Sequence, residues 1–307
     1  MKVYAAQEVH AALTWEPLAR ALERAFVTGA EVPLRHAHAL SGSDTLLLMP
    51  AWNGQMVVLK LVTVMPGAAA TVQATLIVCD RAGGEPLAVL DGEAVTLRRT
   101  AATSALAAQY LARSDAHTLL VVGTGRLAPW MARAHAALRP GLQRVQVWGR
   151  RAEAAQATAR KLVAEGLPAE PVRELEPAVR GACIVCCATT ATEPPVHGAW
   201  LAPGTHLDLV GGFRPHMREV DDAAVARARI VVDTAAGALA EAGDLVQPLE
   251  RGVIDRSHIV AELSQLLGGA VPGRTRADEI TLFKSVGTAL ADLAAAQLVV
   301  LGDRRAR

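Results

Sequence analysis

The stretch that decides the fold covers residues 118–128 and reads Thr-Leu-Leu-Val-Val-Gly-Thr-Gly-Arg-Leu-Ala. A run of strand character leads into the pattern G-x-G-x-x-A, and an apolar helix is expected to follow. In that context Gly123 permits the tight turn, Gly125 lets the backbone approach a pyrophosphate, and Ala128 lets the helix pack closely on the sheet. The helix N-terminus then offers free N–H groups to the phosphates. The six residues alone also fit a tight turn in some other α/β protein, so the surrounding sequence has to decide.

Strand and helix patterns alternate around this turn. From His117 onward we expect short apolar strands at 117–122, 143–148, 182–187, 205–210 and 229–233, with alanine-rich helices at 127–138 and 152–164. This β-α-β alternation predicts a doubly wound parallel sheet of the Rossmann type, with helices on both faces. In that frame the glycine turn predicts dinucleotide binding.

The first 113 residues have a different rhythm. A helix is expected at 16–28 and another at 100–113, and between them strands are expected at 45–49, 56–64, 72–78 and 86–90. Gly and Pro separate the strands by short turns, which favours a mostly antiparallel sheet. A last helix at 284–301 could dock on this part. We therefore expect an α+β domain of residues 1–113 plus 285–307 and a Rossmann domain of residues 114–284.

Composition excludes several classes of function. The chain has 307 residues, of which 51% are apolar and 20% charged, and its formal net charge is +1. That balance gives no electrostatic footprint for nucleic acid. The start lacks the apolar core of a signal peptide, and no run reaches the ~18 apolar residues of a membrane helix. We expect a cytoplasmic protein with no membrane and no nucleic-acid partner.

The four cysteines lie at positions 79, 183, 186 and 187. Cys183 and Cys186 form a C-x-x-C, which is found in redox pairs and metal sites. They fall in an apolar run of strand length, where alternation puts them on opposite faces. No second C-x-x-C or His pair completes a zinc set. We therefore expect buried thiols and no metal.

The second strand of the Rossmann domain bears on the choice of dinucleotide. An NAD site normally has Asp or Glu at its end, which accepts from the ribose 2′-OH. Here the strand ends in Gly149-Arg150-Arg151. Two guanidiniums favour a 2′-phosphate, because they bind phosphate bidentately. The alternative is that both are solvated charges at a helix start. We expect NADPH, with NADH possible.

Several further stretches occur in order along the chain. They are Val32–Arg35, Val58–Val62, Gln73–Thr75, Leu90–Gly92, Arg99–Ala102, Arg218–Asp221, Glu241–Asp244 and Phe283–Gly287. With the glycine turn, they make the chain resemble the ornithine cyclodeaminase/μ-crystallin family along nearly its whole length. The resemblance implies a two-domain α/β fold that is usually dimeric through the first domain. Residues 1–113 plus 285–307 would then form the substrate-binding and dimerisation domain, and residues 114–284 the NAD(P)-binding domain. It also implies an enzyme that acts on small amino acids or cyclic imino acids with a nicotinamide cofactor.

The resemblance also implies a set of site residues. Arg35, Lys60 and Arg99 would line the substrate pocket as the catalytic group. Gln73, Glu241 and Ser285 would lie near the reacting centre, and we assign Gln73 and Glu241, with Phe213, to the substrate. The residues assigned to the cofactor are Gly123, Thr124, Gly125, Arg126, Leu127, Arg150, Arg151, Thr189, Val210 and Ser285.

Physical chemistry supports two of these roles. Lys60 interrupts an otherwise apolar run, where a charge is costly unless it is paired or functional. The alternative is that it points to solvent from a one-sided sheet. Arg99 precedes a helix of small residues, which lets a ligand come close while the guanidinium binds a carboxylate. We also expect the guanidiniums to lower the pKa of Lys60 and so ease proton donation.

One departure from the family pattern separates the possible activities. Cyclodeaminases and alanine dehydrogenases of the family carry an Asp after the fifth strand, in a Gly-Gly-Asp or Gly-Ala-Asp context. This chain has Phe213 there, and a phenyl ring can neither bind the ammonium nor act as a base. The segment resembles instead the reductases of Δ1-pyrroline-2-carboxylate and Δ1-piperideine-2-carboxylate, which form L-proline and L-pipecolate. His216 would be a proton relay only by proximity in sequence.

Other functions stay open at this point. They are ornithine cyclodeamination, oxidation of an amino acid or an N-alkyl amino acid, and non-catalytic binding of NADPH with a small ligand, as in a crystallin. The Arg35, Lys60 and Arg99 set favours an enzyme, because storage has no need of it.

Overall fold

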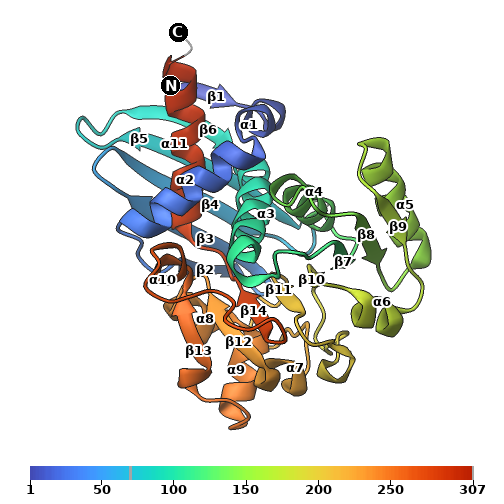
Figure 1. The fold of residues 1–307 in the computed structure, drawn as a ribbon. Coiled ribbons are helices and arrows are strands. Elements are labelled where there is room, and N and C mark those ends of the chain that lie inside the picture. The colour runs from blue at the N-terminus through green and yellow to red at the C-terminus, as the bar shows by residue number, and fades with distance from the viewer. Residues whose placement is uncertain (69–70, 306–307) are drawn as a thin grey trace. The chain divides into compact units, whose positions relative to one another are not determined.

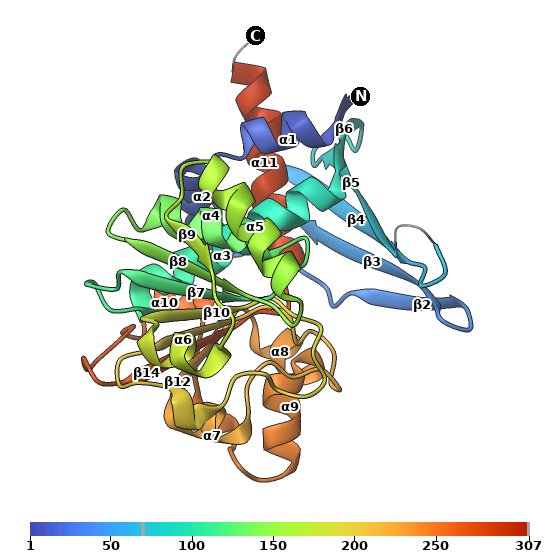
Figure 2. The ribbon, with the colours of Figure 1, turned by 90° about the vertical axis from the view of Figure 1, so that its right-hand side faces the viewer.

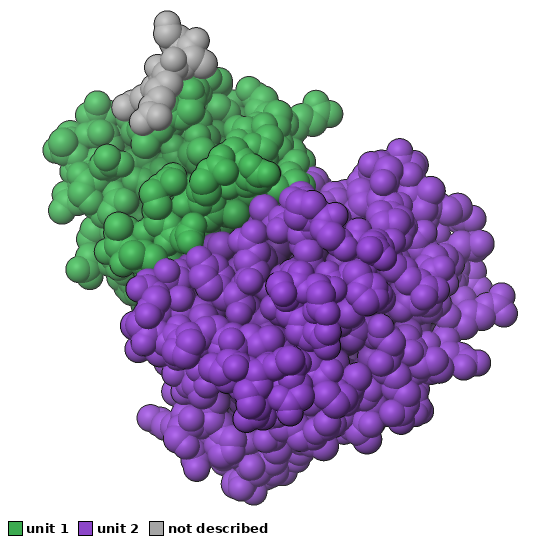
Figure 3. Space-filling model, in the orientation of Figure 1, with its two compact units in different colours: residues 1–100, 288–307 green, residues 101–287 purple. Residues whose placement is uncertain are grey.

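The structure is a computed structural model that describes residues 1–68 and 71–305. It divides into two compact units, coloured separately in Figure 3. Unit 1 comprises Met1–Thr100 and Thr288–Arg307, and unit 2 comprises Ala101–Gly287. The first division falls inside helix α3 (Gly92–Leu111). The expected division into domains, with the role given to each, stays a prediction.

Unit 1 contains a six-stranded sheet in the order β1-β6-β5-β4-β3-β2 (Figure 1). All neighbours pair antiparallel except β1 and β6, so the mostly antiparallel sheet is confirmed. The strands are β1 (Lys2–Tyr4), β2 (His36–Ser41), β3 (Asp44–Trp52), β4 (Met56–Val64), β5 (Val72–Asp80) and β6 (Pro86–Asp91).

The helices of unit 1 cover one face of that sheet. They are α1 (Ala6–Ala12), α2 (Trp15–Thr28) and α11 (Ala289–Arg305), and α11 packs on β3, β4 and α2. Alternation along β4 sends Val58, Lys60 and Val62 to this buried inner face. Leu59 and Leu61 point to the opposite, outer face, where they are only half-buried.

Unit 2 contains an eight-stranded, all-parallel sheet in the order β13-β12-β14-β11-β10-β7-β8-β9. Figure 2 shows α4 and α5 on one side of it and α6 and α7 on the other. The Rossmann-type sheet is therefore confirmed. Its strands are β7 (Thr118–Val122), β8 (Arg144–Trp148), β9 (Ala169–Pro171), β10 (Ile184–Cys187), β11 (His206–Leu209), β12 (Ala228–Val232), β13 (Ile259–Glu262) and β14 (Ile280–Lys284).

The helices that cover this sheet are short except for α4 and α5. They are α4 (Ala128–Leu138), α5 (Ala152–Ala164), α6 (Leu175–Gly181), α7 (Asp222–Arg227), α8 (Ala235–Glu241), α9 (Gly243–Glu250) and α10 (Leu263–Leu267), with 3₁₀ turns at Gly198–Trp200 and Arg256–His258. Among the described residues, none of the helices has both the length and the apolar composition that a membrane span requires.

Two of the expected helix bounds are wrong. Residues 280–284 form the buried strand β14, so the last helix begins only at Ala289. The helix expected at 100–113 begins eight residues earlier, at Gly92, because Asp91 accepts the N–H of Ala94 and starts it there. Cys183 also departs from expectation: it precedes β10 and is half-exposed, whereas Cys186 and Cys187 are buried.

Candidate active site

Lys60 lies at an inward position of β4 and is only 2% exposed. Its Nζ is 2.7 Å from Oδ2 of Asp292, a fully buried carboxylate in the first turn of α11. The other oxygen of Asp292 accepts from Nε of Arg99 at 3.1 Å. One carboxylate therefore holds the two predicted catalytic cations together on the inner face of the unit 1 sheet.

Burial and charge set the state of this group, which we call the Lys60 cluster (Lys60, Arg99 and Asp292). Burial lowers the pKa of Lys60 to about 8, with smaller lowering by Arg99 and Arg35, while Asp292 acts in the opposite direction. The direction is the one expected, but burial rather than the guanidiniums is the leading cause. Burial would raise the pKa of Asp292, yet Lys60 and Arg99 outweigh it and the pKa is lowered.

Arg35 and Gln73, the other two site residues predicted in unit 1, lie outside the Lys60 cluster. Arg35 lies just before β2, is half-buried, and is near enough to act electrostatically on Lys60. Gln73 is exposed on β5 and is paired with Thr63, whereas the row of Lys60 pairs with Leu76. Because side chains alternate along a strand, Gln73 lies on the outer face, opposite Lys60.

In unit 2 the residues assigned to the cofactor gather at the carboxyl edge of the parallel sheet. Register aligns Trp148, Val122, Cys187, Leu209 and Lys284 in one row, the last residues of five neighbouring strands. The residues that follow this row are Gly149 and Arg150, Gly123, Ala188 and Thr189, Val210, and Ser285. Ligands of open parallel sheets bind outside this edge.

The glycine turn has the geometry that a pyrophosphate needs. Gly123 has φ +128°, and a Cβ there would lie 2.5 Å from the carbonyl oxygen of Ala188. Gly149 approaches Thr124 equally closely, since its Cβ would lie 2.6 Å from Cγ2 of Thr124. Gly125 is exposed and a Cβ there would meet nothing within 4 Å. The turn is therefore tightly packed at its first glycine and open at its second, which fits a dinucleotide.

The remaining residues assigned to the cofactor surround this turn. Thr124, Leu127 and Thr189 are half-buried and Val210 is buried, whereas Arg126, Arg150 and Arg151 are exposed. Leu127 precedes α4 and Arg151 precedes α5, so both stand at helix N-termini. At α4 the N–H groups of Ala128 and Trp130 donate to the carbonyl oxygens of Gly125 and Leu127, and Pro129 has no N–H, so the helix dipole rather than free N–H groups would favour a phosphate there.

Ser285 has a partner that the sequence did not indicate. Its hydroxyl donates to Oδ2 of Asp233 at 2.8 Å, and the same oxygen accepts the N–H groups of Val286 at 3.0 Å and Gly287 at 2.7 Å. Asp233 follows β12 directly and is 1% exposed. The carboxylate therefore holds the turn after β14 in place.

Phe213 and Glu241 are the two residues of unit 2 that we assign to the substrate. Phe213 lies in a loop and Glu241 at the end of a helix, near the carboxyl edge of the parallel sheet. Phe213 follows β11 and is 39% exposed, although it is a large apolar side chain. Glu241 is the last residue of α8 and is half-buried.

A third group could hold a metal by its residue types. His135, Cys186 and Asp208 are buried together, with Nε2 of His135 2.9 Å from Oδ2 of Asp208. Burial raises the pKa of the Cys186 thiol well above its ordinary value, with Asp208 adding to the shift, so the thiolate that a metal requires is disfavoured. We interpret the group as a hydrogen-bonded part of the core, and the expected absence of a metal stays a prediction.

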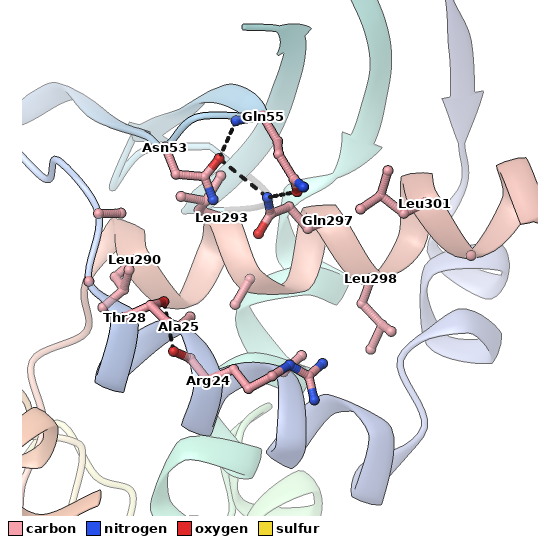
Figure 4. Close-up of a pocket in the computed structure, with 15 residues that line it drawn as sticks. Arg24, Ala25, Thr28, Asn53, Gln55, Leu290, Leu293, Gln297, Leu298 and Leu301 are labelled. Carbon is pink, nitrogen blue, oxygen red and sulfur yellow. Dashed lines mark hydrogen bonds between the residues drawn. The ribbon is translucent and has the colours of Figure 1, made fainter. Parts of the chain in front are cut away.

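A hollow of about 290 Å³ lies between α2 and α11 in unit 1 (Figure 4). Its lining is mostly Ala and Leu, and Gln297 donates across it to Asn53 and Gln55. Among the described residues of the lining, Arg24 is the one that carries a charge. A guanidinium is a poor acid or base near neutral pH, so we do not place a reaction in this hollow.

The parallel sheet with its glycine turn and the buried Lys60 cluster define an α/β enzyme of the dinucleotide-binding class. The model of the ornithine cyclodeaminase/mu-crystallin family matches residues 1–303, so the chain belongs to this family, as its motifs predicted.

Individual relatives support a narrower class. The Δ1-pyrroline-2-carboxylate reductase of Colwellia psychrerythraea is 36% identical over 98% of each chain. That of Thermococcus litoralis, solved with NADH and L-proline, has a TM-score of 0.94 at 31% identity and covers 100% of this chain and 98% of its own. An archaeal alanine dehydrogenase dimer with NAD has a TM-score of 0.92 at 28% identity, over 99% and 96%. The chain is accordingly an NAD(P)H-dependent oxidoreductase of C=N bonds.

Proposed function

We propose that this protein reduces a cyclic ketimine carboxylate, Δ1-pyrroline-2-carboxylate or Δ1-piperideine-2-carboxylate, to L-proline or L-pipecolate with NADPH. The observation that carries the proposal is the Lys60 cluster, in which a buried ammonium with a pKa of about 8 lies beside a guanidinium. An ammonium of that pKa can donate a proton near neutral pH, and a guanidinium binds a carboxylate.

The glycine turn with Arg150 and Arg151 would hold NADPH, and the cofactor would supply a hydride for the imine carbon. Lys60 donates a proton from Nζ to the imine nitrogen, which becomes the secondary amine of the product. Asp292 orients Lys60 at 2.7 Å and holds Nε of Arg99 at 3.1 Å, so that the guanidinium is fixed when it meets the substrate carboxylate. Arg35 adds positive charge near Lys60 and favours an anionic substrate.

Phe213 favours an imine over an amine as the substrate. Its exposed ring suits the apolar edge of a cyclic ketimine and offers no acceptor for an ammonium. Cyclodeamination of ornithine and oxidation of a primary amine both need such an acceptor. We therefore expect the reductive direction to dominate.

A substrate panel tests the proposal. Purified protein with NADPH should oxidise the cofactor, followed at 340 nm, when either cyclic ketimine acid is added. Ornithine with NAD should release no ammonia, and L-alanine with NAD should give no NADH. Ammonia from ornithine would support the cyclodeaminase instead. Binding of NADPH without turnover of any imine would indicate a non-catalytic binding protein.

The proposal of NADPH rests on Arg150 and Arg151, exposed at the end of β8 and the start of α5. We expect the double substitution Arg150→Ala/Arg151→Ala to raise the KM for NADPH by about tenfold or more, since each charge-assisted bond contributes about 1.5–3 kcal/mol. The KM for NADH should change by less than about twofold, because no 2′-phosphate is lost. Equal effects on both cofactors, measured by steady-state kinetics, would contradict the preference.

The outer face of the unit 1 sheet supports a homodimer. Leu48 pairs with Leu61 and Leu59 with Ile77 on this face, and all four are half-buried. A contiguous apolar sheet face marks an interaction site. We expect a dimer by light scattering, and a shift towards monomer for Leu61→Asp, which puts a charge in the middle of the face. Thr63→Asp, further along the same strand, is the control for a smaller disturbance. An unchanged dimer in Leu61→Asp would place the interface elsewhere.

A further inference from the structure

Three buried charges in unit 2 have no part in the reaction proposed above. Glu219, Asp244 and Lys284 are each 0% exposed, and we call them the Glu219 network. Removing an ion from water costs several kcal/mol unless partners compensate. Such a group in a sheet protein calls for a structural or functional reason.

Glu219 joins the ends of two central strands. Its Oε1 accepts the N–H of Thr189 at 2.7 Å and the hydroxyl of Thr189 at 2.9 Å. Its Oε2 accepts the N–H of Gly211 at 2.7 Å. Thr189 follows β10 and Gly211 follows β11, so one carboxylate spans both loops at the carboxyl edge of the sheet.

Asp244 and Lys284 hold Glu219 in turn. Oδ1 of Asp244 accepts the N–H groups of Glu219 at 2.6 Å and Val220 at 3.1 Å, and its Oδ2 is 2.9 Å from Nζ of Lys284. Lys284 ends β14, the neighbour of β11. The network thus ties the ends of three adjacent strands to the N-terminal turn of α9.

The backbone packs tightly around this network at three glycines. A Cβ on Gly211 would overlap the carbonyl oxygen of Thr189 and Oε1 of Glu219. A Cβ on Gly212 would overlap Oδ2 of Asp244, and one on Gly243 would overlap the carbonyl oxygen of Met217. The segment 211–219 is therefore held at both ends, and it carries Phe213 exposed between them.

We infer that Glu219 is a positioning residue that fixes Thr189 and the segment 211–219 for the nicotinamide and the imine. The inference rests on the proposed function for its substrate. For its effect on cofactor binding, it requires that the carboxyl edge of the sheet holds the cofactor. Asp244 and Lys284 keep the Glu219 carboxylate pointing at its two N–H donors.

The ionisation of Glu219 supports this inference. Burial raises the pKa of Glu219 to about 7, Asp244 of α9 adds to the rise, and Lys284 of β14 and the N–H groups of Thr189 and Gly211 oppose it. Cys187 of β10 faces the same group, and its thiol is neutral because burial raises its pKa. Below pH 7 the carboxyl group of Glu219 becomes protonated. The oxygen that carries the proton is then a weaker acceptor for the N–H group of Thr189 or Gly211.

Glu219→Gln tests the inference, because the amide has the same shape but must turn an NH₂ group towards one of the two N–H donors. We expect kcat to fall about tenfold or more, with a several-fold weaker NADPH affinity measured by fluorescence titration without substrate. Glu176→Gln, on the exposed face of α6, is the control and should change neither. Thr189→Val removes the hydroxyl bond to Glu219 and the weaker one from the N–H of Ala191 but keeps the N–H bond to Glu219, and it should give a smaller loss of the same kind.

A pH series separates positioning from general stability. The difference in NADPH affinity between wild type and Glu219→Gln should be full at pH 8 and should shrink as the pH falls through 7, because protonated Glu219 resembles the amide. A lower melting temperature with unchanged kcat and NADPH affinity at 20 °C would overturn the inference. If no imine is reduced by the wild type, the proposed function fails, while the binding titrations still decide the role of Glu219.

Discussion

Lys60→Met should abolish imine reduction while NADPH still binds. General acid catalysis contributes about 100- to 10,000-fold to a rate, and Met removes the donor while keeping the length and apolar stem of the side chain. The glycine turn, where the phosphates of NADPH would bind, does not include Lys60, so the fluorescence titration with NADPH should match wild type. The measurement is kcat from stopped-flow or steady-state oxidation of NADPH at saturating ketimine.

Lys161→Met, an exposed lysine of α5, is the matched control and should keep full activity. Retention of more than a tenth of the wild-type kcat in Lys60→Met would remove Lys60 from the proton transfer. The Arg99 and Asp292 pair would then hold the substrate without a lysine acid, and the proton would have to come from another group.

The pH dependence follows from the same residue. With a pKa of about 8, Lys60 is an ammonium below that pH and a neutral amine above it. Reduction needs the ammonium, so kcat/KM, which reports the pKa values of the free enzyme, should fall as the pH rises through about 8. Oxidation of L-proline needs the amine as a base, so its rate should rise through the same pH. The two inflections should coincide and should both be missing in the residual activity of Lys60→Met.

The sequence was informative where the physical signal is local. The glycine turn, the strand Met56–Val64 and the helix Ala152–Ala164 agree with the structure because their patterns are long or come with turn residues. Strand Ile280–Lys284 was not predicted, and its last residue was taken as the start of the final helix, because a fully buried strand shows no alternation and the buried Lys284 is paired with Asp244. Helices α6 to α10 are too short to show a period.

In the candidate site, too, residues with a local signal could be predicted from the sequence, whereas a partner that is distant in the chain could not. Lys60 and Arg99 were recognisable because a charge interrupts apolar or small neighbours. Their carboxylate partner was not, since Asp292 lies 193 residues from Arg99 along the chain and only the fold joins them. A signal was present in hindsight: Asp292 is the single acid within Ala289–Ala296, a stretch otherwise made of Ala and Leu. Gln73, by contrast, came only from the family resemblance, and the fold puts it on the opposite face from Lys60.

The second large effect is expected for Asp292→Asn. The amide keeps the shape of the carboxylate but loses its charge, so Lys60 and Arg99 remain buried as two cations with no anion between them. Removing one partner of a buried ion pair costs about 3–5 kcal/mol, and the melting temperature should fall accordingly. Asp303→Asn, in the same helix and paired with Lys2 near the surface, is the matched control, for which about 0–1 kcal/mol is expected.

The loss of the Asp292 charge should also change the pH dependence of the reaction. Asp292 acts to raise the pKa of Lys60, against the lowering by burial, Arg99 and Arg35. In Asp292→Asn the inflection in kcat/KM for reduction should therefore move below pH 8, because the ammonium has lost its counter-ion. At pH 8 the variant then holds mostly neutral amine and should be slower than wild type, with recovery as the pH falls. A variant that melts at the wild-type temperature and keeps the inflection at pH 8 would show that Asp292 does not govern Lys60, and the geometry of the cluster would lose its functional meaning.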